Sequence, residues 1–135
     1  MKTTNQLAEM VTALIASQDG FTITAEGKPL QRGYVVGGLV RRDSDALAKL
    51  KQPNSAADYE ELTKLTAQLI EEHRDLIAQG AALGGWRQGN TISLDLVTIH
   101  DSGRQAAKVA RQREQLALGI IEGYRYAGEV SLTNN

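Results

Sequence analysis

Arg113 is the residue whose place in the sequence most strongly suggests binding chemistry. Residues 102–117 have a helical pattern, and at about 100° per residue the alanine, valine and leucine side chains gather on one face, with Arg113 among them. A guanidinium is rarely buried without a partner, and its planar fork suits phosphate or carboxylate. Arg113 is therefore either the phosphate anchor of a pocket between helix and sheet, or a structural residue paired with a strand carboxylate such as Asp95 or Glu129. Arg113 can play both roles at once if Asp95 orients the guanidinium toward a phosphate.

The opposite face of the same predicted helix carries three more cations. Arg104, Lys108 and Arg111 follow at spacings of four and three, and Gln115 continues the line, so together they form a strip. Arg104 falls in the first turn, where a cation opposes the helix dipole while the free N–H groups favour an anion. The strip is either a second surface for an anionic ligand or an ordinary solvated helix face.

Trp86 is the candidate for stacking on a ligand. It is the one tryptophan of the chain and lies at the end of a predicted strand, close to Asn90. In one interpretation the indole stacks on a purine while Asn90 reads a base or ribose edge; in the other, Trp86 covers the edge of the core. Tyr34, Tyr124 and Tyr126 are further residues suited to stacking.

The sequence offers little material for catalysis or for a metal centre. His100 and Asp101 form a lone dyad, His73 falls on the apolar face of a predicted helix, and no nucleophile, histidine and acid stand in a recognisable order. Glycine pairs occur at 37–38 and 84–85, but they match no phosphate-binding loop and predict bulges or close backbone packing. We therefore expect no catalytic residue, no metal and no cofactor.

Composition limits the class of protein. The chain has 135 residues, enough for one domain over residues 1–135. Its 15 basic and 16 acidic side chains nearly cancel, which argues against a nucleic-acid partner and makes any anion site local. There is no cysteine, no recognisable signal peptide and no stretch approaching the roughly 20 apolar residues that span a bilayer, so we expect a cytoplasmic protein without a membrane partner.

Helical and strand patterns alternate along the chain, and turn residues separate them. The strands at 21–24 and 33–40 are expected to pair through a hairpin or a wider loop, and those at 81–86 and 91–100 through a tight hairpin. These elements predict an α+β fold, a single domain with a largely antiparallel sheet of about six strands flanked by helices. The remaining expected elements are a helix to about Ser17, a helical turn at 46–50, a long helix from the cap at Ser55 to Gly80, a helix at 102–117, and strands at 118–122 and 124–132.

Three segments, taken in order, resemble a known family. They are Gly20-Phe21-Thr22-Ile23 with Gly33-Tyr34-Val35-Val36, then Gly84-Gly85-Trp86 with a strand centred on Asp95, then residues 106–117 with Arg113-Glu114-Gln115-Leu116-Ala117. The arrangement resembles the first described family of anti-Thoeris phage proteins. These small sponges sequester cyclic ADP-ribose signals of bacterial immunity and, in some members, cyclic oligonucleotides. The resemblance covers nearly the whole chain, although residues 41–56 have no counterpart in it.

The resemblance implies a non-catalytic dimer, often built into a hexamer, with the nucleotide enclosed near the subunit interface. On this chain it points to Arg111, Arg113 and Trp86, with tryptophan in place of another aromatic. We therefore expect a sponge in the host-cell cytoplasm, if phage-encoded, that binds a cyclic nucleotide signal without cleaving it. The alternative is a protein-interaction module that docks its cationic helix on an acidic host surface.

Overall fold

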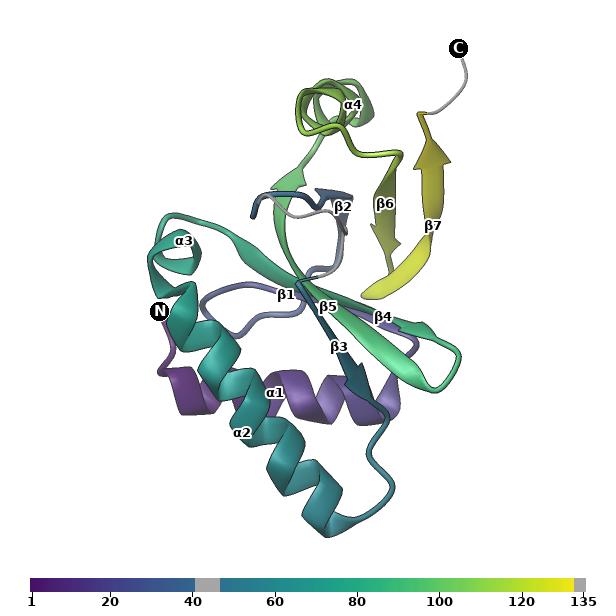
Figure 1. Ribbon diagram of the computed structural model, residues 1–135. Coiled ribbons are helices and arrows are strands. Elements are labelled where there is room, and N and C mark those ends of the chain that lie inside the picture. Colours follow the sequence, from purple (N-terminus) through teal and green to yellow (C-terminus); the bar gives the residue numbers. More distant parts are fainter. Residues whose placement is uncertain (41–46, 133–135) are drawn as a thin grey trace.

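A curled antiparallel sheet with helices on its outer side forms the frame of this computed structural model, which describes residues 1–40 and 47–132 (Figure 1). The strands lie in the order β1-β4-β5-β2-β6-β7, with β3 added beside β5, and every pairing is antiparallel. The predicted α+β fold with a largely antiparallel sheet is confirmed. The helices are α1 (Thr4–Ser17), α2 (Ala56–Glu72), α3 (Arg74–Ala78) and α4 (Gly103–Gln112); the strands are β1 (Gly20–Ile23), β2 (Arg32–Val36), β3 (Ala48–Lys51), β4 (Ala82–Gln88), β5 (Thr91–His100), β6 (Ala117–Glu122) and β7 (Arg125–Ser131).

Strand β5 links the two halves of the sheet. One edge pairs with β4 from Thr91 to Val97 in the hairpin that the sequence predicts. Its other edge changes partner, because Thr91 to Leu94 pair with β3 and Thr98 to His100 pair with β2. Ten residues long, β5 therefore belongs to both halves, and the sheet bends around it. This bend gives the sheet an inner, concave face.

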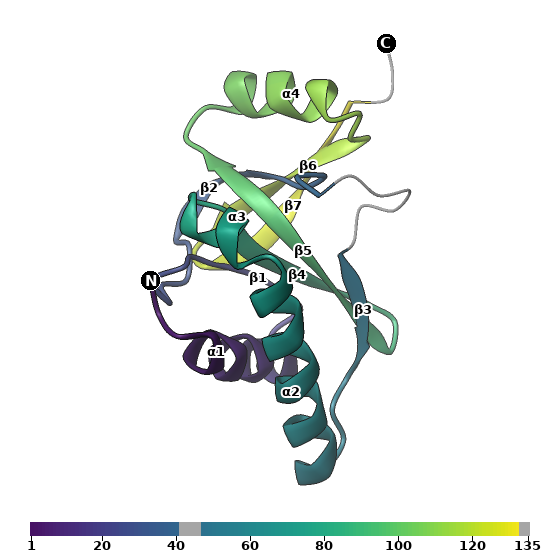
Figure 2. The ribbon, with the colours of Figure 1, turned by 60° about the vertical axis from the view of Figure 1, so that its left-hand side comes forward.

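Helices cover the outer face on both sides of that bend (Figure 2). Helices α1 and α2 bury one side, where Leu7 and Val11 meet sheet residues such as Leu94. Helix α4 covers β2 and β6 through Ala106 and Ala110. A third apolar cluster fills part of the inner face; it consists of Val35, Ala82, Val97 and Ile121.

The two ends of the sheet come back together at Tyr126. This residue lies on β7, the last strand of the path, yet it packs against Gly20 on β1, the first strand. A Cβ atom added at Gly20 would stand 2.6 Å from the Cβ of Tyr126, and one added at Gly119 would stand 2.9 Å from its ring. Contacts this close need glycine, because a methyl group would overlap the tyrosine. The sheet thus closes nearly into a barrel.

Three of the expected local structures are wrong, and tertiary pairing explains two of them. Strands β1 and β2 do not pair with each other, because β1 pairs with β4, and β2 fits between β5 and β6. The helical turn expected at 46–50 is instead strand β3, as far as residues 47–50 are described, since the first half of β5 offers it an edge. The long helix breaks at His73, where the backbone leaves helical geometry (φ −118°, ψ 23°) and α3 begins.

Helix α4 ends earlier than its periodicity suggests. It starts as predicted, with the Ser102 side chain accepting a hydrogen bond from the Gln105 N–H, but its last helical residue is Gln112 and not residue 117. Glu114 adopts a left-handed conformation (φ 59°), and the Gln115 N–H bonds to the Ala110 carbonyl in the pattern of a Schellman motif. Glycine usually marks such a stop, so a glutamate there hides it in the sequence.

The contact between β1 and β7 leads to a stability prediction. Gly20→Ala should lower the free energy of unfolding by about 1–3 kcal/mol, because the new methyl overlaps Tyr126. In a Tyr126→Gly background, which has no Cβ to meet, the same change should cost less than about 0.5 kcal/mol. Urea unfolding of the four proteins measures this coupling. Equal costs in the two backgrounds would show that the sheet does not close through this contact.

Candidate functional site: a cavity inside the curled sheet

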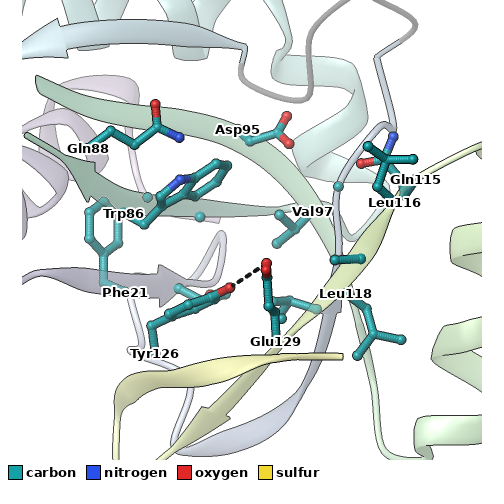
Figure 3. Close-up of a pocket in the computed structure, with 17 residues that line it drawn as sticks. Phe21, Trp86, Gln88, Asp95, Val97, Gln115, Leu116, Leu118, Tyr126 and Glu129 are labelled. Carbon is teal, nitrogen blue, oxygen red and sulfur yellow. Dashed lines mark hydrogen bonds between the residues drawn. The ribbon is translucent and has the colours of Figure 1, made fainter. Parts of the chain in front are cut away.

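A cavity of about 300 Å³ lies on the concave side of the sheet (Figure 3). Residues of β1, β2, β4, β5, β6 and β7 line it, together with Gln115 and Leu116 from the turn after α4. Its volume is at the lower end of the range for small-molecule sites, and curled sheets commonly hold ligands in this place. The geometry identifies this cavity as the candidate functional site.

Trp86 and Tyr126 give the cavity two large aromatic faces. Trp86 lies on β4 opposite Gly20 of β1, and its side chain is partly buried. Tyr126 reaches in from β7, where the pairing with β6 shifts by one residue between Ile120 and Ile121. That bulge places Tyr126 and Glu129, three positions apart, on the same face of the strand. The two side chains then meet, and the Tyr126 hydroxyl donates to Glu129 Oε2 across 3.4 Å.

Carboxylates and amides form the polar part of the lining. Asp95 is 4% exposed, and its Oδ1 accepts a hydrogen bond of 2.8 Å from the Leu96 N–H. Glu129 enters from the opposite wall, and burial together with this carboxylate raises the pKa of Tyr126. The amides belong to Gln88 and Gln115. Among the described lining residues there is no lysine, arginine or histidine.

Glycines allow the strands and side chains of the cavity wall to pack closely together. Gly84 faces Asp95 across the β4–β5 ladder, and a Cβ there would lie 3.0 Å from Val97. Gly37 passes directly against the Asp95 carboxylate, in a place that a larger residue would fill. The two glycine pairs noted in the sequence therefore serve close packing: their neighbours have room, and Asp95 remains at the cavity wall.

Arg113 lies behind the cavity wall and is not part of the lining. It caps the C-terminus of α4, and its Nη1 donates to Val36 O (3.1 Å), Gly37 O (3.3 Å) and Thr98 Oγ1 (2.9 Å). Burial lowers the pKa of Arg113, and the charge of Asp95 acts in the opposite direction. The guanidinium therefore joins α4 to the end of β2, which is the structural interpretation of this residue.

The structure separates the other predicted residues. Trp86 and Asp95 line the cavity, whereas the strip of Arg104, Lys108 and Arg111 is exposed on the outer side of α4. Gln115, predicted to extend the strip, faces the cavity instead, because the helix stops before it. The last two predicted residues lie elsewhere: Asn90 is exposed in the β4–β5 turn, and Tyr34 packs on Gly103 at the start of α4.

Of the polar lining, the sequence predicts only Asp95 as a site residue. It offers Glu129 only as a partner for Arg113 and Tyr126 only as one of several stacking residues, and it gives no sign that Gln88 lines a cavity. A β-bulge and a helix stop without glycine bring these side chains inward, and neither leaves a clear pattern in the sequence.

The described residues hold no group of three potential metal ligands. His100, half of the dyad in the sequence, has a lowered pKa because of burial and the nearby Arg113 charge, while Asp101 acts to raise it.

No described helix is long and apolar enough to cross a membrane. In comparisons with protein families, with curated proteins and with solved structures, no match to this chain was found.

The position of Arg113 leads to a prediction that compares it with a neighbouring arginine. Arg113→Ala should lower the free energy of unfolding by about 1–3 kcal/mol, because three partly buried acceptors lose their donor. Arg111→Ala, two residues earlier on the exposed face, should change it by less than about 0.5 kcal/mol. Thermal and urea unfolding check both. An Arg113→Ala variant as stable as the parent protein that no longer binds nucleotide would instead favour the anion-anchor role.

Proposed function

We propose that this protein binds and sequesters a nucleotide signal without cleaving it, with one base held in the cavity. The proposal rests on the cavity that Trp86 and Tyr126 line, because their aromatic faces suit a flat heterocycle. The ligand class follows the family resemblance: cyclic ADP-ribose isomers or cyclic oligonucleotides. Sequestration requires a dissociation constant on the order of nM, equivalent to about 12 kcal/mol, and a preformed site favours such tight binding.

The charges of the site suggest how such a ligand would lie. Asp95 and Glu129 line the cavity, and a phosphate beside them would be repelled. The phosphates therefore remain outside the cavity. Arg111 and Arg113, the arginines to which the family resemblance points, are not among the described lining residues. We propose that a second copy of the chain, in a dimer or hexamer, completes the phosphate-binding part. The host-cell cytoplasm is the proposed location.

A second candidate function rests on the exposed cationic strip of α4. Arg104, Lys108 and Arg111 have no carboxylate within salt-bridge distance in the described part of the chain. Such a strip suits docking on an acidic host protein, through charges that steer association more than they tighten it. In this alternative the cavity plays no part, and replacing Trp86 would leave the activity unchanged.

Calorimetry against cyclic ADP-ribose isomers and cyclic di- and trinucleotides tests the proposal. At least one should bind with a dissociation constant on the order of nM, and denaturation should release it intact. Trp86→Ala should weaken binding about 10-fold or more, through lost stacking. Tyr126→Ala should weaken it as well, through lost stacking and through loss of the contact that closes the sheet. Tyr124→Ala, at an exposed tyrosine outside the cavity, is the matched control.

Two results would contradict the proposal. Recovery of a cleaved ligand would indicate an enzyme. Absence of binding to every nucleotide, together with capture of an acidic partner that is lost in Arg104→Glu, would leave the interaction module.

A further inference from the structure

The two acidic residues of the cavity determine which edge of a base can face them. An ionised carboxylate only accepts hydrogen bonds, so a ligand group that meets Asp95 or Glu129 has to be a donor. They enter from opposite walls, on β5 and β7, and the aromatic ring of Trp86 lies beside the space between them (Figure 3). A base stacked on Trp86 thus has an acceptor at its rim.

Glu129 is the better placed of the two to take new hydrogen bonds. The bulge in β7 turns it inward, and the donor that reaches it in the described structure is the Tyr126 hydroxyl, at a long 3.4 Å. A carboxylate has about four acceptor positions, so this bond leaves most of its capacity for a ligand. Asp95, by contrast, is already engaged by the Leu96 N–H and lies against Gly37.

The natural bases differ at the edge that a carboxylate would read. Guanine presents two adjacent donors, N1–H and the 2-amino group, whose separation matches the two oxygens of a carboxylate. Adenine places the acceptor N1 beside its 6-amino donor, so one carboxylate oxygen would face a lone pair. Hypoxanthine has N1–H without the amino group, so its match to a carboxylate is intermediate between those of guanine and adenine. Apolar stacking on Trp86 distinguishes these purines very little.

We propose that the cavity selects guanine, with Glu129 accepting from N1–H and the 2-amino group of a base stacked on Trp86. This inference rests on the function proposed above and narrows its ligand class. A guanine-containing cyclic oligonucleotide is then preferred over cyclic ADP-ribose, whose base is adenine. Glu129 is the specificity-determining residue, and Tyr126 positions it through their hydrogen bond.

Free nucleosides test the base preference without any contribution from phosphate. Guanosine, inosine and adenosine are titrated by calorimetry, with the fluorescence of the single tryptophan, Trp86, as a local readout. Guanosine should bind most tightly, inosine less tightly, and adenosine about 10- to 100-fold more weakly than guanosine, the range expected for hydrogen bonds to a charged acceptor.

The matched pair of variants is Glu129→Gln and Glu122→Gln. Both residues are exposed, so neither change should disturb the fold, but Glu122 does not line the cavity. Glu129→Gln should lower guanosine affinity about 10-fold or more and should not weaken adenosine, because an amide has one acceptor and a donor beside it, the pattern that matches the 6-amino group and N1 of adenine. Glu122→Gln should leave all three affinities unchanged.

Several outcomes would overturn the inference, and they are distinguishable from failure of the proposed function. If adenosine binds as tightly as guanosine, or Glu129→Gln keeps the guanosine preference, the cavity binds a base but Glu129 does not select it. If no nucleoside binds while a cyclic ADP-ribose isomer does, the guanine preference fails and sequestration stands. If neither nucleosides nor any cyclic nucleotide bind, both proposals fail.

Discussion

The arrangement of this molecule depends on the contact between Tyr126 and the two glycines beneath it. Gly20 and Gly119 let the last strand of the sheet return against the first, which converts an open sheet into a nearly closed one. Without that return, Trp86 and Asp95 would lie on an open concave surface exposed to water. Because the sheet closes, Trp86 and Asp95 line a cavity of about 300 Å³ together with Tyr126 and Glu129. One packing constraint thus supports both the fold and the candidate site.

The same closure separates the two kinds of charge in the protein. Two carboxylates, the buried Asp95 and the exposed Glu129, line the cavity of the curled sheet, whereas the arginines and lysine of α4 remain on its outer side. Arg113 lies between these regions, where it bonds to the backbone of β2 and feels the charge of Asp95. A guanidinium that already serves three neutral acceptors is poorly placed to be a phosphate anchor. The interior suits a base better than an anion.

Much of the secondary structure could be predicted from the sequence, whereas of the site only Trp86 and Asp95, with Tyr126 as one of several stacking candidates, could be. Helix α1, the β4–β5 hairpin and the start of α4 have local signals, namely apolar periodicity, turn residues and the cap at Ser102. Strand partners depend on tertiary competition, so the pairing expected between β1 and β2 was wrong. Gln115 and Glu129 enter the cavity through a left-handed glutamate and a β-bulge, and no side-chain pattern marks either.

Whether a nucleotide enters the curled sheet is the central question, and nuclear magnetic resonance answers it most directly. Amide and indole N–H signals of the 15N-labelled protein are followed while a cyclic nucleotide is added. We expect the largest shifts at the Gly84, Gly85 and Gly119 amides and at the Trp86 indole, all at the cavity. Shifts confined to α4, with the Trp86 indole unmoved, would contradict this expectation and place the ligand on the cationic helix.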